Sequence, residues 1–127
     1  MRLRGIRLNH ARGTVKRDPR RFDDLFKNFG AIHVRPMFGG EGLYSGVLMI
    51  GLVLEDRLYL KTGDLNRADF LTENCKPFTY SRGRKITSMS YFEVPDRLLD
   101  DPEEFGRWAR KAEAAALAAK KPRKKSR

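Results

Sequence analysis

The stretch Arg35-Pro-Met-Phe-Gly-Gly-Glu-Gly-Leu-Tyr44 and the apolar run Val47-Leu-Met-Ile-Gly-Leu-Val-Leu54 decide the fold that the sequence predicts. An extended segment enters a turn that contains Gly39, Gly40 and Gly42, and it leaves as the most hydrophobic part of the chain. Glycine tolerates positive φ and close backbone approach, so these glycines predict a tight structural turn between two strands. The apolar run predicts a central strand that is covered on both faces.

Strand patterns continue on both sides of this turn. Residues 31–38 alternate with a period of two, and Pro36, which cannot donate a ladder hydrogen bond, predicts an edge position for that strand. Residues 57–61 return as the hairpin partner of the apolar run. Residues 78–82 and 85–94 predict a second hairpin around Gly83.

Three segments have the period of an amphipathic helix. The first begins at Asp18-Pro19 and ends at Gly30, and its apolar stripe is Phe22, Leu25, Phe26 and Phe29. The second runs over residues 64–74, and its expected buried contacts are Ala68 with Phe70 or Leu71. The third begins after an Asp101 N-cap, and its expected buried stripe is Phe105, Trp108, Ala109, Ala112 and Ala116.

The order of these elements predicts an α+β fold of two layers, an antiparallel sheet with helices on one side. The order is helix, three or four strands, helix, two strands, helix. We expect a flexible basic arm over residues 1–17, a folded domain over residues 18–119 and a disordered basic tail over residues 120–127.

The net charge of +11 is concentrated at the two ends of the chain. Residues 1–21 carry eight Lys/Arg against one acid, and residues 120–127 carry six against none. Residues 22–119 carry 13 Lys/Arg against 15 Asp/Glu. The folded part is therefore nearly neutral, and any electrostatic attraction to nucleic acid is expected from the ends.

Composition also restricts the compartment. One cysteine, Cys75, excludes an internal disulfide and suits a reducing environment. No apolar run reaches the length of about 20 residues that spans a bilayer, and the Arg-rich beginning lacks the apolar core of a secretory signal. We therefore expect a cytoplasmic protein with no membrane association.

Several motifs together resemble one family. They are the turn with its flanking Arg35, Met37 and Tyr44, the strand 57–61, and the later blocks Asn66-Arg-Ala-x-Phe70, Pro77-Phe-x-Tyr80 and Met89-Ser-Tyr-x-x-Val-Pro95. In this order they resemble the N-terminal domain of the TfoX (Sxy) family of bacterial competence regulators, over residues 22–119.

The resemblance implies both a fold and a role. The fold it implies is of the secretion-chaperone-like type. The role is non-enzymatic: the family promotes expression of DNA-uptake genes together with the cyclic-AMP receptor protein. Full-length members carry a second, helical C-terminal domain, so the resemblance implies a single-domain member here.

The residues themselves predict no catalytic, metal or cofactor site. The glycine turn lacks the lysine and Ser/Thr of a phosphate-binding loop and leads into a strand. His10, His33 and Cys75 are too scattered for a metal site. No Ser/His/Asp or Cys/His set is visible, and the acidic doublets lie at helix starts, so we expect no enzyme.

The solvent side of the sheet is the better candidate. Aromatic residues, methionine and arginine are enriched in interface cores. Such residues recur on one side of the expected strands, at Arg35, Met37, Tyr59, Lys61, Met89 and Tyr91. This face is expected either to bind a protein partner or a second copy in a homodimer, or to be an ordinary solvated surface or one partly covered by another helix.

The basic tail is the second candidate. Its cations can neutralise phosphates without reading sequence, and they are Lys120, Lys121, Arg123, Lys124, Lys125 and Arg127. With the role that the resemblance implies, we expect a bacterial protein-interaction module in transcriptional regulation. The alternative is a protein that binds nucleic acid weakly and non-specifically through its basic ends.

Overall fold

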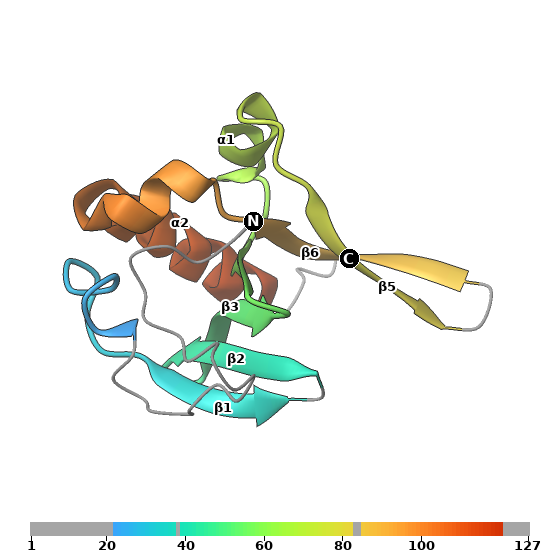
Figure 1. Cartoon of the computed structure of the whole chain (residues 1–127), viewed down its shortest axis with the longest axis horizontal. Coiled ribbons are helices and arrows are strands. Elements are labelled where there is room, and N and C mark those ends of the chain that lie inside the picture. The colour runs from blue at the N-terminus through green and yellow to red at the C-terminus, as the bar shows by residue number, and fades with distance from the viewer. Residues whose placement is uncertain (1–21, 38, 83–84, 121–127) are drawn as a thin grey trace, which may run out of the picture.

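A computed structural model describes residues 22–37, 39–82 and 85–120 (Figure 1). Four strands come first, and they are β1 (His33–Met37), β2 (Gly40–Ser45), β3 (Leu48–Leu54) and β4 (Arg57–Lys61). Helix α1 (Arg67–Thr72) separates them from β5 (Pro77–Arg82) and β6 (Lys85–Glu93). The 3₁₀ helix η3 (Asp96–Asp100) and the long helix α2 (Pro102–Lys120) follow.

The strands form one antiparallel six-stranded sheet in the order β1-β2-β3-β4-β6-β5. The sheet and its helices confirm the predicted α+β fold. The strand that contains Pro36 lies at the edge and the apolar strand β3 lies inside the sheet, as predicted. The β5–β6 hairpin extends away from the rest of the molecule (Figure 1).

The pleat divides the sheet into two faces. One row of register partners, Leu43, Gly51, Leu60 and Phe92, points toward the helices. The adjacent row, Gly42, Leu52, Tyr59 and Glu93, therefore points the other way. We call the first side the core face and the second the outer face.

Helix α2 covers β3 and β4 on the core face. Alanines at Ala109, Ala112 and Ala116 are buried, and their small side chains let the helix approach the sheet closely. The backbone N–H of Glu104 donates to Oδ1 of Asp101 at 3.2 Å, so the predicted N-cap is confirmed. The helix extends through Lys120, one residue past the predicted domain boundary.

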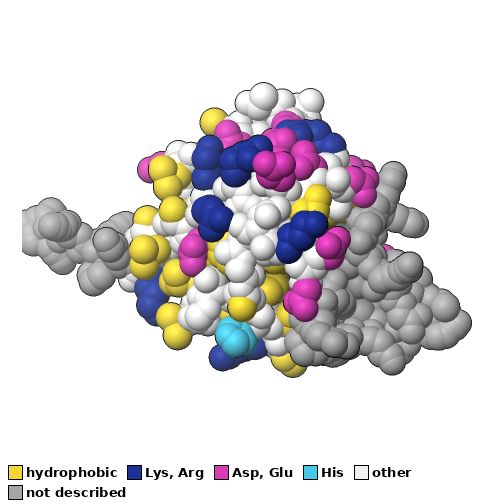
Figure 2. All heavy atoms as spheres, turned by 90° about the vertical axis from the view of Figure 1, so that its left-hand side faces the viewer, with side chains coloured by type: hydrophobic (Ala, Val, Ile, Leu, Met, Phe, Trp, Pro, Cys, Tyr) yellow, Lys and Arg dark blue, Asp and Glu magenta, His cyan; other side chains and the backbone are white. Residues whose placement is uncertain are grey.

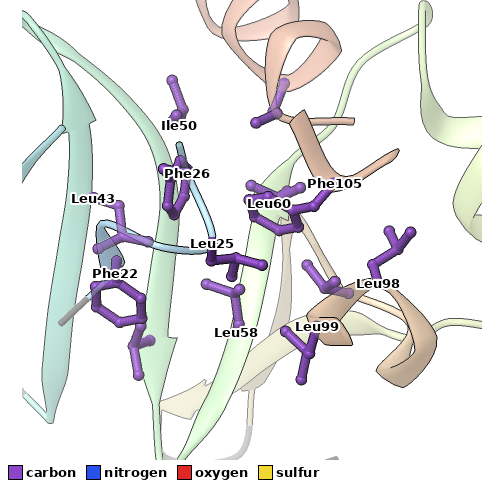
Figure 3. Close-up of a cluster of buried hydrophobic side chains, with 14 of the residues drawn as sticks. Phe22, Leu25, Phe26, Leu43, Ile50, Leu58, Leu60, Leu98, Leu99 and Phe105 are labelled. Carbon is purple, nitrogen blue, oxygen red and sulfur yellow. The ribbon is translucent and has the colours of Figure 1, made fainter. Parts of the chain in front are cut away.

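The core lies between α2 and the sheet, and it includes side chains from before the first strand (Figure 3). Phe26 packs edge-on against Phe105 of α2, with the two ring centroids 4.9 Å apart. Leu98 and Leu99 of η3, an element that the sequence patterns did not predict, close one side of this core.

The predicted first helix is wrong for the residues that the structure describes. Residues 22–30 form successive turns, in which the N–H of Phe26 donates to the carbonyl of Phe22 and that of Phe29 to Phe26. Phe22, Leu25 and Phe26 are nevertheless buried. The apolar spacing correctly indicated which side chains face the core, but packing, rather than a regular hydrogen-bond ladder, holds them there.

The second helix is shorter than predicted, at Arg67–Thr72, and Asn66 braces the turn between β4 and this helix. Its buried amide donates to the carbonyl of Lys61 at 3.0 Å and its Oδ1 accepts from the N–H of Gly63 at 2.8 Å. Phe70 is buried as expected. Ala68, in contrast, is exposed, so that predicted contact is wrong.

Candidate functional site: the outer face of the sheet

The outer face brings together most of the side chains that the sequence suggested for an interaction face. Register places Arg35 opposite Gly42, Tyr59 opposite Glu93 and Lys61 opposite Tyr91. Met37 lies in β1 two residues beyond Arg35, so it shares this face. Met89 lies in β6, but its side chain is outside the part that the structure describes.

Two further residues of this face, Tyr44 and Met49, were missed by sequence reasoning. They are register partners, and the position of Met49 depends on a shift in the pairing of β2 with β3. Leu43 pairs with Gly51 but Tyr44 pairs with Met49, which makes Ile50 the extra residue of a β-bulge. Strict alternation would place Met49 on the core face, so nothing in the local pattern indicates its true position.

Gly42 leaves space for the side chains of this surface because it has no side chain of its own. A Cβ at this position would lie 3.0 Å from the Tyr44 ring, 3.1 Å from Sδ of Met49 and 3.5 Å from Sδ of Met37. The absent side chain therefore lets one tyrosine and two methionines converge over the strand. Gly42 lies within β2 and not in the turn; among the three predicted turn glycines, Gly39 has the positive φ, at +79°.

Gly40 is required for a different reason. A Cβ there would lie 2.0 Å from the carbonyl oxygen of Val53, a backbone atom of the neighbouring strand. Such a contact cannot be relieved by rotating a side chain, so glycine at this position permits close approach of β2 and β3. Gly39 and Gly40 thus shape the sheet.

A second cluster on the outer face joins Tyr91, Lys61 and Met49. The hydroxyl of Tyr91 donates to the carbonyl oxygen of Met49 at 3.2 Å, across the intervening strand. Nζ of Lys61 lies 5.1 Å from the centroid of the Tyr91 ring. Burial raises the pKa of Tyr91 to about 12, with a smaller contribution from Tyr44, and burial lowers the pKa of Lys61.

The other end of the outer face has a conventional ion pair. Nη1 of Arg57 donates to Oε2 of Glu93 at 2.9 Å. Tyr59 stacks edge-on against Phe78 with ring centroids 5.4 Å apart. Burial and the nearby carboxylate of Glu93 raise the pKa of Tyr59. This surface combines half-buried aromatic rings, methionines and cations, which suits recognition by packing rather than proton transfer.

The helical side of the molecule has a shallow depression of about 380 Å³ between α1 and α2. Arg97 crosses one edge of it and pairs with both Glu73 and Glu104, and Nζ of Lys111 lies 3.0 Å from Oδ2 of Asp69. Its lining thus balances acids and bases. Figure 2 likewise shows basic and acidic side chains interspersed on the side that carries residues 22–30.

We searched the described residues for a metal site, a reactive cysteine and a membrane-spanning helix. Within them, no group of three or more His, Cys, Asp and Glu is arranged to hold a metal ion. Burial, with help from Glu73 and Glu93, raises the pKa of the Cys75 thiol to about 11, which disfavours a reactive thiolate. No helix in the described part of the chain has the length and apolar character needed to cross a membrane.

The predicted nucleic-acid contacts lie almost entirely outside the described residues. Lys120 is exposed at the last position of α2. The other five cations, Lys121, Arg123, Lys124, Lys125 and Arg127, and the arm over residues 1–17 fall beyond the described part. Their contact with nucleic acid stays a prediction.

Comparison with known proteins assigns the family. The sequence-family model named TfoX N-terminal domain matches residues 24–116, which include the whole sheet and most of α2. The chain belongs to the TfoX N-terminal domain family. The outer face described above is therefore a surface of a TfoX N-terminal domain.

This TfoX N-terminal domain is also similar to a curated protein. It is 34% identical over 76 residues to the DNA transformation protein TfoX1 of Aliivibrio fischeri. The aligned region covers 60% of this chain and 36% of that protein. The match thus spans little more than a third of the length of the relative.

Proposed function

We propose that this chain is a non-enzymatic regulatory module of bacterial competence that acts by binding a protein partner through the outer face of its sheet. Family membership and the name of the similar DNA transformation protein support the regulatory part. The interaction part rests on one observation: the sheet face opposite α2 gathers aromatic rings, methionines and cations, most of which remain partly exposed around the buried Leu52 and Tyr91.

The geometry favours binding over chemistry for two reasons. Two cations of this face, Arg35 and Lys61, lie near aromatic rings, with Cζ of Arg35 5.0 Å from the centroid of Tyr44. The pKa shifts of Tyr59, Tyr91 and Lys61 all favour the neutral form through burial, which indicates a surface that is already partly desolvated. Because part of this face is already out of contact with water, covering it with a partner removes less water from it than covering a fully exposed surface would.

The regulatory role is tested in the cell of origin. Deletion of the gene is expected to lower transformation by exogenous DNA, and the native gene to restore it. A Tyr59→Ala/Tyr91→Ala variant is expected to fail in restoration at equal protein level. The matched control is Leu71→Ala, because Leu71 is 54% exposed on α1, away from the outer face. Full restoration by the double variant would contradict the proposal.

Direct contact is tested by placing a photo-crosslinking amino acid at Tyr59 or at Leu71. The outer-face position is expected to give a discrete crosslinked protein in cells, and the α1 position is not. Equal crosslinking from both positions, or from neither, would contradict binding through the sheet.

Binding through the basic ends is distinguished by salt. The full chain and a variant with neutral residues at 121–127 are titrated into labelled duplex DNA at two salt concentrations. Binding that disappears with the tail and falls steeply with salt would assign nucleic-acid contact to the end, because phosphate neutralisation is ionic. The outer-face variants should leave such binding unchanged.

A further inference from the structure

The outer face carries two cations that lack a carboxylate. Among the ion pairs of the described residues, none includes Lys61 or Arg35, and both side chains are held by aromatic rings instead. Arg57, in contrast, is already paired with Glu93. The half of this face around Tyr44, Met49 and Tyr91 is therefore positively charged and apolar together.

Lys61 is the more informative of the two cations. It is half-buried at the end of β4, where this strand pairs with β6 through Lys61 and Tyr91. Burial of an ammonium without a carboxylate partner opposes folding. A cost of this kind is typical of a position that is kept for binding, where a partner supplies the missing negative charge.

A second copy of this chain fits the surface poorly. A two-fold contact places the same patch on both sides, so Arg35 and Lys61 would face their own equivalents. Glu93, which could have relieved that repulsion, is already bound to Arg57 at 2.9 Å. Addition of a partner strand at the β1 edge is also disfavoured, because Pro36 cannot donate a hydrogen bond.

We propose that the occupant of the outer face is an acidic amphipathic helix of a partner protein, whose apolar stripe packs on Tyr44 and Met49 and whose carboxylate pairs with Lys61. This inference rests on the proposed function and names the chemistry of its partner. A helix is favoured over a strand because it presents apolar residues and a carboxylate one turn apart on a single side, matching a mixed sheet face.

The test uses two fluorescein-labelled synthetic helical peptides of about 20 residues, long enough for stable helicity. Both carry the same Leu/Phe stripe, and they differ only in having Glu or Lys beside it. Anisotropy titration with the full chain is expected to give roughly tenfold tighter binding of the Glu peptide, the scale of one well-placed charge pair.

The full chain is strongly basic, so charge-matched variants are needed to separate the site from general attraction. Lys61→Glu and Arg107→Glu change the net charge equally, but Arg107 is exposed on α2, on the other side of the sheet. We expect Lys61→Glu to weaken the Glu peptide at least tenfold and to improve the Lys peptide. Arg107→Glu should change either affinity less than about twofold.

Lys61→Met keeps the length and packing of the side chain and is checked for folding by circular dichroism. It should remove the preference for the Glu peptide while retaining apolar binding. Equal losses in the Lys61 and Arg107 variants, no preference between the peptides, or no binding would overturn the inference. So would light scattering that shows a dimer which Lys61→Glu dissociates, because the occupant would then be a second copy.

The two proposals fail in different ways. If the photo-crosslinker at Tyr59 captures a partner but the peptides show no charge preference, the acidic helix is wrong and partner binding through the outer face stands. If neither crosslinking nor complementation depends on the outer face, the proposed function itself is wrong.

Discussion

The two faces of the sheet are built from the same strands by the same alternation, yet their chemistry differs. Leu58 and Leu60 of β4 are fully buried against the helices, whereas Tyr59 and Lys61 between and beyond them remain partly exposed. The core face is mostly apolar, with Glu41 as a buried polar exception. The outer face mixes rings, methionines and cations. One face therefore holds the hydrophobic core, whereas the other presents a mixed surface that the core does not require.

The largest difference between the two faces is expected for alanine substitutions at two neighbouring residues of β4. Leu60→Ala is expected to lower the free energy of unfolding by about 2–5 kcal/mol, because a fully buried side chain leaves a cavity. Tyr59→Ala, one residue away on the outer face, should cost about 1 kcal/mol. Urea denaturation followed by circular dichroism measures both. Equal costs would show that the outer face belongs to the core.

Alanine substitutions at two glycines of β2 are expected to give the next largest effects, and the two should differ from each other. Gly40→Ala forces a Cβ against a backbone carbonyl, so we expect a loss of about 1–3 kcal/mol in unfolding free energy. Gly42→Ala meets side chains that can move, so it should cost less and should instead displace Tyr44 and Met49. Chemical unfolding gives the first quantity, and chemical shifts of the Met49 methyl group report the second. The reverse order would contradict the geometry.

The Arg97 ion pairs join the end of α1 to η3 and α2 on the helical side, and they are partly exposed. Arg97→Ala should therefore cost about 1 kcal/mol or less, and less still in high salt. Hydrogen bonds from Arg97 lower the pKa of Glu104. A lowered carboxyl pKa stabilises the fold above the ordinary glutamate value of about 4.3 and ceases to do so as pH falls through the lowered pKa.

The measurement for this pair is urea unfolding of the native chain and Arg97→Ala at pH 7 and at about pH 3. The difference between the two proteins should be present at neutral pH and should shrink in acid. A difference that is independent of both pH and salt would show that Arg97 acts through packing of its stem.

The smallest effect is expected at Lys61 and has the opposite sign. Because burial lowers its pKa, the charged form opposes folding at neutral pH, and this penalty is relieved as pH rises through the lowered pKa. Lys61→Met should therefore raise the free energy of unfolding by a few tenths of a kcal/mol, after solvent screening. Differential scanning calorimetry compares the two proteins. A destabilised variant would argue that Lys61 is structural.

Much of the fold followed from local patterns. Pro36 indicated the edge strand, the apolar run indicated β3, and Asp101 indicated the start of α2. The candidate face was predicted in part, because alternation along single strands places Tyr59 with Lys61. The helix expected before Gly30 is absent from the described residues. The apolar spacing there correctly indicated which side chains are buried, but it does not determine the backbone hydrogen bonds.

Local sequence patterns were sufficient to predict the α+β class of the fold and the elements with clear end signals, such as α2 after Asp101. Those features depend on residues that are near one another along the chain. The β-bulge at Ile50, the outward position of Met49 beside Tyr44 and the space that Gly42 leaves for both became visible only in the folded chain. Register between strands depends on packing across the whole sheet, and a one-residue shift exchanges the faces.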